Sequence, residues 1–501
     1  MSDADIRALR AKLKHLDLLQ SINGLLGWDE QVNLPPASGP RRAEQLAAMA
    51  AVIHEAQVDP ELGRVLEQLE NADVPLSEDE RVILQWARRD YDHARRLPEA
   101  FVRRKAALES EGFHVWREAR SANDFGRFAP VLEQQIALLK EEAALQGMGD
   151  RPYDYLLDQF DPGLTEADVE TLFAVLKADL VPFVRAVVDS PVKAHPEKLR
   201  GLPVEGQNRF LREVVEAIGF DFARGRIDVA VHPFCSGDAA DTRLTTRFSE
   251  EEPLSSLFGA IHEAGHGLYE QGLPVEHLGT ALGEAVGMAV HESQSRIWEN
   301  QVGRGRAFWQ HFEPRFREIF GERLDAVSSE ELFLAVNAVA LTPIRVEADE
   351  VTYNLHIILR FEMERRLFGG DVKIDELPGL WNALTRELLG FEPASDAEGI
   401  LQDVHWSCGL FGYFPSYCIG NMVAAQLWKA IRSQMPDIEA DFARGDFSRM
   451  LGWLREHVHR QGRRYRTKEL VQKVTGEALS PVHLIDYLKE RYAPLYLPEA
   501  R

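Results

Sequence analysis

The stretch FGAIHEAGHGLYEQGLP, residues 258–274, contains two histidines and a glutamate whose types and spacing suit metal-dependent hydrolysis. His262 and His266 are four residues apart, so on a helix they project from one face and both imidazoles can reach a single zinc ion. Glu263 is rotated off the ligand axis but stays near the metal, where a carboxylate can take a proton from water. The pattern predicts a hydrolytic zinc site with Glu263 as general base. The alternative is a helix that carries two histidines by chance.

A hydrolytic zinc site also needs a third protein ligand and an open position for water. We expect the third ligand on a second helix over residues 279–303, which offers Glu284 and Glu292. Small side chains on roughly one stripe lead to Glu292 and would let this helix approach its neighbour closely. The small residues of this stripe are Ala281, Ala285 and Ala289. We therefore favour Glu292 over Glu284, and the alternative for either glutamate is a solvated helix face.

The elements around the motif are predicted to be helices. Apolar residues recur at three- and four-residue steps from about residue 253, and Gly272 followed by Pro274 is a stop signal. The first half of the chain shows the same periodicity, for example over 41–57 and 78–97, whereas the Pro- and Gly-containing stretch 27–40 is expected to be a turn-rich connection.

Alternating apolar residues over 226–249 predict a small β-ribbon within this helical chain. Helical periodicity then continues to the C-terminus, interrupted only by the Gly-, Pro- and aromatic-rich stretch 405–417. No low-complexity linker or internal repeat separates the parts. We therefore expect one large, two-lobed helical unit.

Composition and charge exclude several classes of partner. The chain has 80 acidic and 57 basic side chains, for a net charge of -23, which disfavours nucleic acid as a partner. No apolar stretch approaches the ~20 residues of a membrane span, and the N-terminus lacks the pattern of a secretory signal. The 3 cysteines show no CxxC spacing. These features predict a cytoplasmic protein with reduced thiols.

The HEAGH motif (262–266) is one of six strings that occur in one order along the chain. The other five are HPF (232–234), DTRLT (241–245), HESQS (291–295), IRVEAD (344–349) and GILQDVHW (399–406). Together the six strings closely resemble the signature set of the carboxypeptidase Taq family of metallocarboxypeptidases. The stretch WDEQVNLPP (28–36) also looks like the N-terminal region of this family.

The resemblance implies a mainly α-helical, neurolysin-like metallopeptidase in which residues 1–501 form a single catalytic domain of two lobes around a deep groove. It implies a zinc or cobalt ion bound by His262, His266 and Glu292, with Glu263 as the base, in agreement with the spacing argument. The expected activity is the removal of one residue at a time from peptides with a free C-terminus, with broad specificity. The resemblance also implies a homodimer.

A carboxypeptidase needs a cation for the terminal carboxylate of its substrate, and the planar fork of arginine can hold a carboxylate by two hydrogen bonds. The resemblance points to Arg345 for this role, with Tyr417 as a hydroxyl partner. By chemistry alone Arg243 competes. Residues in the other matching strings are predicted to position the substrate or the zinc histidines: His232, Gln402, Asp403 and His405. For Asp349, orienting Arg345 or capping a helix is as good an interpretation as a catalytic role.

Two alternatives to the carboxypeptidase interpretation remain at this point. An endo-acting or dipeptide-releasing oligopeptidase of similar helical architecture would use the same metal chemistry and would also cleave peptides with an amidated C-terminus. A helical scaffold with a structural or vestigial zinc site would normally fill the fourth metal position with Cys or His. None of the cysteines lies near His262 in sequence, so we favour an enzyme.

Overall fold

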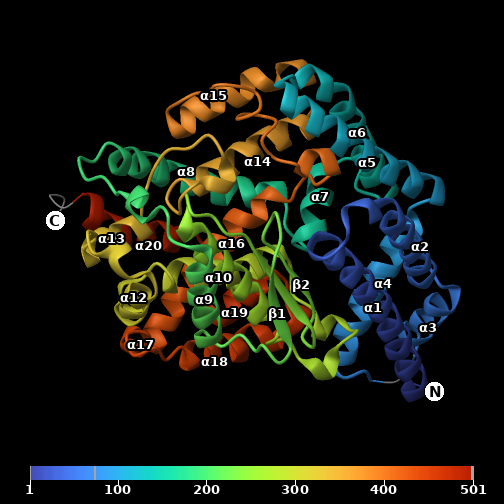
Figure 1. Cartoon of the computed structure of the whole chain (residues 1–501). Coiled ribbons are helices and arrows are strands. Elements are labelled where there is room, and N and C mark those ends of the chain that lie inside the picture. Colours follow the sequence, from blue (N-terminus) through green and yellow to red (C-terminus); the bar gives the residue numbers. More distant parts are fainter. Residues whose placement is uncertain (1, 73–74, 498–501) are drawn as a thin grey trace. The chain divides into compact units, whose positions relative to one another are not determined.

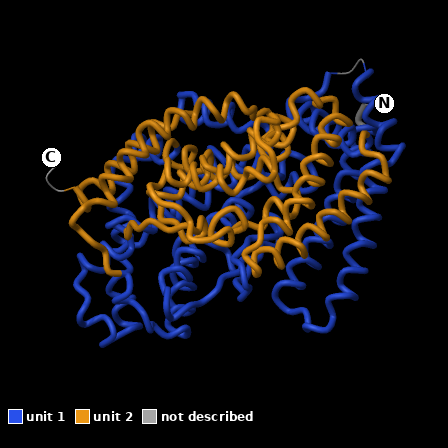
Figure 2. Tube along the Cα trace, turned by 90° about the horizontal axis from the view of Figure 1, so that it is seen from above, with its two compact units in different colours: residues 1–95, 196–336, 427–478 blue, residues 96–195, 337–426, 479–501 orange. Residues whose placement is uncertain are grey.

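Helices form most of the chain in the computed structural model, which describes residues 2–72 and 75–497 (Figure 1). The prediction of a mainly α-helical fold with a small β element is confirmed. The chain divides into two units that each take three segments, as Figure 2 shows. Unit 1 comprises residues 1–95, 196–336 and 427–478, and unit 2 comprises residues 96–195, 337–426 and 479–501. Among the described residues, no helix is both long and apolar enough to cross a bilayer.

Unit 1 contains the small sheet and the helix with the HEAGH motif. Its α-helices are α1 (Ser2–Val32), α2 (Gly39–Gln57), α3 (Pro60–Glu70), α4 (Glu78–Arg96, which ends one residue beyond the unit), α9 (Val204–Ala217), α10 (Pro253–Glu270), α11 (Met288–Arg296), α12 (Arg306–Phe320), α13 (Ser329–Val336), α17 (Ile438–Phe442), α18 (Ser448–His457) and α19 (Thr467–Thr475). A π-helical turn, η5 (Ile297–Val302), continues directly from α11.

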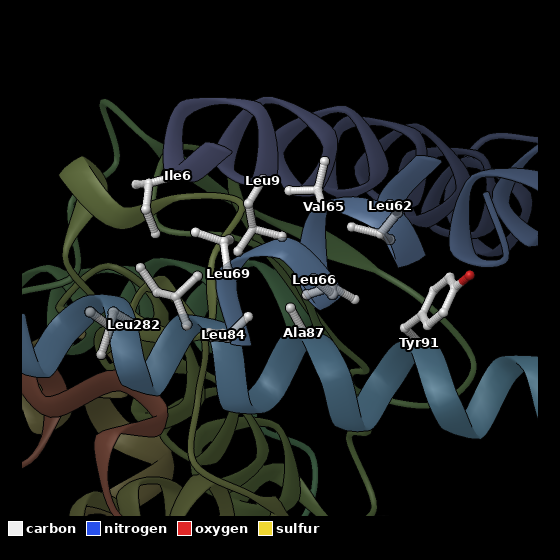
Figure 3. Packing of buried hydrophobic residues seen from close by; sticks show 11 residues of the cluster. Ile6, Leu9, Leu62, Val65, Leu66, Leu69, Leu84, Ala87, Tyr91 and Leu282 are labelled. Carbon is white, nitrogen blue, oxygen red and sulfur yellow. The ribbon is translucent and has the colours of Figure 1, made fainter. Parts of the chain in front are cut away.

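One hydrophobic cluster holds the first helices of unit 1 together (Figure 3). Leucines and other apolar side chains from α1, α3 and α4 interdigitate there, and Leu282 joins them from a later segment. The contact between α3 and α4 is close, because a Cβ added at Gly63 would lie 2.1 Å from the hydroxyl of Tyr91. Burial of these apolar faces stabilises the bundle of amphipathic helices.

The sheet has three strands in the order β1-β3-β2. Strand β1 (Gly225–Val229) pairs in parallel with β3 (Thr242–Thr246), and β2 (Cys235–Gly237) pairs antiparallel with β3. The predicted ribbon over 226–249 is therefore a sheet whose central strand comes last in the sequence. Helix α10 lies against β3, since a Cβ added at Gly267 would lie 2.9 Å from a methyl group of Leu244.

Unit 2 has helices and no strand among its described residues. Its α-helices are α5 (Glu99–Ala122), α6 (Phe125–Leu145), α7 (Pro152–Phe160), α8 (Glu166–Val188), α14 (Tyr353–Gly369), α15 (Leu377–Leu389), α20 (Val482–Tyr496) and most of α16 (Phe414–Gln434), whose last turns belong to unit 1. Two short 3-10 turns, η7 (Arg345–Glu347) and η9 (His405–Cys408), coincide with two of the sequence strings noted above.

The predicted turn-rich connection over 27–40 is shorter than expected, because α1 continues to Val32. Trp28 is buried beneath the guanidinium groups of Arg226 and Arg243, which lie 4.9 and 4.3 Å from its ring centre. Asp29 forms an ion pair of 2.6 Å with Arg42 of α2. These contacts stabilise the last turns of α1, which Gly27 disfavours.

The predicted helix over 279–303 is wrong at its start, because α11 begins only at Met288. Gly279 has a φ of +80°, in the left-handed region, so a right-handed helix cannot run through this residue. A Cβ added at Gly283 would lie 2.5 Å from the carbonyl oxygen of His277, so the chain makes a tight turn in this region. The proposed stripe of small residues is consequently not one helix face.

Candidate metal and substrate-binding sites

Helix α10 presents His262, Glu263 and His266, and α11 presents Glu292. The two helices approach each other without intervening side chains at Gly265. A Cβ added at that glycine would lie 2.5 Å from the carbonyl oxygen of Gln294 and 2.6 Å from the Cα atom of Ser295. The absence of a side chain at Gly265 therefore permits the close approach that the sequence argument assigned to alanines of the second helix.

The predicted ligands His262, His266 and Glu292 come together in unit 1 as a group that could hold a metal ion. The Nε2 atoms of His262 and His266 lie 3.7 and 3.5 Å from the same oxygen, Oε2 of Glu292. Ligands arranged tetrahedrally around zinc at ~2.1 Å lie about 3.4 Å from one another. The donor types and spacings thus fit a zinc ion.

The outer nitrogen of each histidine has a partner that fixes the ring. His262 Nδ1 lies 2.9 Å from Glu299 Oε2, and His266 Nδ1 lies 2.6 Å from His291 Nδ1. His291 in turn donates from Nε2 to Glu270 Oε1 over 2.8 Å. A proton on each Nδ1 leaves the Nε2 lone pair directed at the space beside Glu292, which is the tautomer that a metal ligand requires.

Two arginines compensate the two buried carboxylates of this site. Arg296 donates to Glu292 Oε1 over 2.6 Å and to Glu299 Oε2 over 3.2 Å, while Arg304 lies 3.2 Å from Glu299 Oε1. Burial alone would raise the pKa of Glu299, but Arg296 and the hydrogen bond from His262 lower it to about 2. Glu292 likewise has a pKa well below its usual value, because Arg296 and His262 outweigh its burial.

Glu263 has the opposite electrostatic environment. Its side chain is buried, and burial raises its pKa to about 7, with the negative charge of Glu292 acting in the same direction. Burial and the neighbouring His291 lower the pKa of His266 to about 3, so that imidazole is neutral near pH 7. A carboxyl group with a pKa near neutrality beside the neutral imidazole of His266 is the arrangement that a general base of metal-assisted hydrolysis needs.

Unit 2 brings Arg345 and Asp403 together with Arg360, a residue that sequence reasoning missed. Arg345 donates from Nε and Nη2 to Asp403 Oδ1 over 3.0 and 2.9 Å, and from Nη1 to the hydroxyl of Tyr353 over 3.1 Å. Arg360 donates from Nε to Asp403 Oδ2 over 2.6 Å. Gln402 accepts from the backbone N–H of Arg345 over 2.8 Å and so fixes the start of η7.

This cluster carries two buried guanidinium groups and one carboxylate. Arg345 is 6% exposed and Arg360 is fully buried, and Asp403 is the only carboxylate that hydrogen-bonds to either of them among the described residues. Burial would raise the pKa of Asp403, but Arg345 and Arg360 hold it well below its usual value. Burial lowers the pKa of His405 to about 3, so this neighbour adds no charge near pH 7. The cluster therefore has an excess positive charge.

Tyr417 and His405 lie beside this cluster. The guanidinium carbon of Arg345 is 5.2 Å from the ring centre of Tyr417, and the Tyr417 hydroxyl lies 3.5 Å from His405 Nε2. Asp349 does not reach Arg345 through any hydrogen bond recorded for the described residues. Its carboxylate accepts from the backbone N–H groups of Val351 and Thr352 instead, in the turn just before α14 begins at Tyr353.

The remaining predicted residues lie in unit 1 and are engaged differently. Arg243 forms an ion pair of 2.8 Å with Asp241 and stacks on Trp28, so its guanidinium is already engaged within unit 1. His232 is exposed in the connection between β1 and β2. Glu284, the rejected third ligand, forms an ion pair of 2.7 Å with Arg463.

The helical fold and the three convergent ligands define a class, that of helical proteins with a two-histidine, one-carboxylate metal centre. Residues 8–492 match the family model described as carboxypeptidase Taq (M32) metallopeptidase, and the chain belongs to this family. The prediction of a metal-dependent peptide hydrolase is therefore confirmed at the level of the family.

Curated relatives and solved structures agree with this assignment over nearly the full chain. The thermostable carboxypeptidase 1 of Thermus thermophilus is 43% identical over 95% of this chain and 96% of its own. Carboxypeptidase 1 of Bacillus subtilis is 37% identical over 97% of both chains. The crystal structure of an M32 carboxypeptidase from Deinococcus radiodurans superposes with a TM-score of 0.96 at 41% identity, covering 98% of this chain and 99% of that one.

Proposed function

We propose that this chain is a zinc-dependent carboxypeptidase that removes single residues from the free C-terminus of peptides with broad specificity. The convergence of His262, His266 and Glu292 beside the buried Glu263 carries the proposal. Membership of a metallopeptidase family supports it. We propose further that residues 1–501 act as one catalytic domain, so that both units are needed for activity.

Zinc, or cobalt in its place, held by His262, His266 and Glu292 would supply a Lewis acid that polarises the scissile carbonyl and lowers the pKa of water. Glu263, with a pKa near 7, takes a proton from the attacking water and then delivers it to the leaving amine. Glu299 and His291 hold the two ligand imidazoles in the tautomer that exposes Nε2.

In this proposal Arg345 binds the terminal carboxylate of the substrate. The excess positive charge of the cluster formed by Arg345, Arg360 and Asp403 supports the assignment, because a second carboxylate would neutralise it. Tyr417 contributes a hydroxyl group beside Arg345. Gln402 and Asp403 orient Arg345, while His232, His405 and, less favourably, Arg243 remain proposed substrate-positioning residues.

The test is mass spectrometry of one peptide offered as the free acid and as the C-terminal amide, with metal-loaded and chelator-treated protein. We expect a ladder of single-residue losses from the free acid alone, abolished by the chelator. Internal or dipeptide cuts that also occur in the amide would move the assignment to an oligopeptidase and remove Arg345 from its proposed role.

We propose two further properties, a cellular location and an oligomeric state. The three cysteines are unpaired in the structure, which supports the proposal of a cytoplasmic location with reduced thiols. A homodimer is proposed from the family resemblance. Light scattering coupled to gel filtration tests the dimer, and a monomer mass at micromolar concentration would contradict it.

A further inference from the structure

A pocket of about 500 Å³ lies in unit 1 at the C-terminal end of α10. The segment 271–277, which follows α10 directly, forms one wall, and none of the proposed metal ligands lines the pocket. Four arginines line it: Arg224, Arg455, Arg460 and Arg464. Glu276 is the only acidic residue among the described residues of this lining, so the lining has more basic than acidic side chains within a chain whose net charge is -23.

Two of the four arginines are already engaged. Arg224 forms an ion pair of 3.0 Å with Asp221 and also donates to the carbonyl oxygen of Ala239 over 2.9 Å. Arg464 lies 2.7 Å from a carboxylate oxygen of Asp79. These contacts explain why both guanidinium groups are held at the pocket wall.

The side chains of the other two arginines, Arg455 and Arg460, are not held by such contacts. The side chains of Arg455 and Arg460 form no hydrogen bond or ion pair with any other described residue, and the Nε atom of Arg455 is buried without a partner. Burial and the positive charges of Arg224 and Arg460 lower the pKa of Arg455. A buried donor without a partner, such as Nε of Arg455, costs free energy, whereas the exposed side chain of Arg460 is free to bind an anion.

A second unpartnered polar atom belongs to the same pocket. His277 lines the pocket, and its Nδ1 atom is buried with no hydrogen-bond partner among the described residues. An imidazole nitrogen can donate to an anion in its protonated or Nδ1-H form. The pocket thus combines two free guanidinium groups and one free ring nitrogen.

We infer that this pocket is a binding site for a compact anion that carries two or more phosphate groups. Arginine forks match phosphate oxygens by paired hydrogen bonds, and the volume suits a small ligand. A long polyanion such as a nucleic acid is disfavoured, because the strongly acidic chain would repel its remaining phosphates.

The test is isothermal titration of the metal-loaded full chain with inorganic pyrophosphate and, separately, with ATP at constant ionic strength. The variants are Arg455→Met, which keeps the length of the side chain, and Arg460→Gln, which changes an exposed residue. The matched control is Arg209→Gln, since Arg209 is an exposed arginine of the same unit that lies 3.3 Å from Glu213 on its own helix. Any contact of the probe with the bound metal is the same in all four proteins, so the differences report on the pocket.

We expect saturable binding at one site, weakened about tenfold or more by either pocket variant and unchanged by the control. Equal affinity for the two probes would identify the phosphate groups alone as the ligand, and tighter binding of ATP would identify a nucleotide. Absence of saturable binding at millimolar concentration, or equal affinity in wild type and Arg460→Gln, would overturn the inference. Arg460→Gln decides the outcome if Arg455→Met does not fold.

Discussion

Three carboxylates near the predicted metal position carry different charges because their neighbours differ. Glu292 and Glu299 have lowered pKa values beside Arg296, whereas Glu263 has a pKa of about 7 because it is buried without a comparable cation. Carboxylates of one site can thus serve as a ligand, as an orienting group and as a base. This division of function depends on arginines that no motif identifies.

For Glu263→Gln we expect kcat to fall by about 10² to 10⁴-fold with little change in metal content. The amide has the same shape as the carboxylate but cannot accept the proton of the attacking water. Peptide hydrolysis and metal analysis of the same preparation provide the two measurements. A variant that keeps wild-type kcat would exclude Glu263 as the base.

For Glu299→Gln we expect about a 10 to 100-fold loss of zinc affinity, because His262 loses the charged partner that orients its ring. Competition with a chromophoric chelator measures the affinity. Glu330→Gln is a suitable control, since Glu330 forms only an exposed ion pair with Arg306. Equal zinc affinity in all three proteins would show that Glu299 does not position the ligand.

For Arg345→Ala we expect the release of C-terminal residues to fall by about 10²-fold or more in kcat/KM, while zinc content stays intact. Arg345→Lys keeps the charge but loses the fork, so it should recover only part of the activity. The substitution also breaks a buried ion pair with Asp403, which can destabilise the fold. The thermal unfolding of each variant is therefore measured together with its kinetics. Full activity of the alanine variant would refute the proposed carboxylate contact.

Sequence reasoning found the site residues that share one helix and missed some of those that meet only in the folded structure. His262, Glu263 and His266 share one helix, so a spacing rule suffices to propose them. Tyr353 contacts Arg345, and Arg360 contacts the Asp403 that Arg345 also binds, only through tertiary packing, and no periodicity signals these contacts. Their chemistry was visible in the sequence, but their neighbours were not.

At the level of helices, periodicity located elements better than it located their ends. The helix over 279–303 was predicted to start at a glycine, yet the turn around Gly283 delays its start to Met288. In the opposite direction, burial of Trp28 extends α1 into a stretch predicted as a turn. Tertiary contacts override local propensity in both cases.

The contact between α10 and α11 gives a prediction about packing. Gly265→Ala should force the helices apart, because the added Cβ would lie 2.5 Å from the carbonyl oxygen of Gln294. We expect a loss of about 1–3 kcal/mol in stability together with weaker zinc binding. Gly259→Ala on the same helix is the matched control, since its added Cβ meets only Pro233 at 3.8 Å. Thermal unfolding with and without zinc compares the variants, and similar behaviour of both would contradict the close approach.

Over the whole molecule, buried histidines predict sensitivity to acid. Burial lowers the pKa of His459 in unit 1 and His356 in unit 2 to about 3, whereas an unfolded histidine titrates near its ordinary value of 6.5. Below pH 6.5 the unfolded chain therefore binds protons that the folded chain does not, so stability is full above that pH and falls progressively toward pH 3.

The variant His459→Gln should remove one such contribution. We expect the melting temperature of the wild type to fall more steeply than that of the variant between pH 7 and pH 4.5, by the equivalent of roughly 2 kcal/mol at pH 5. Parallel pH profiles of the two proteins would show that His459 is not kept neutral by the fold.

The division of the chain into two units of three interleaved segments has a consequence for synthesis on the ribosome. Unit 1 takes its last segment from residues 427–478, and unit 2 takes its last from residues 479–501. Neither unit can be completed by an N-terminal portion of the nascent chain, because the missing segment emerges only near the end of translation. The face of α8 that packs against α20 therefore awaits its partner for most of synthesis, the period in which chaperones would act on this protein.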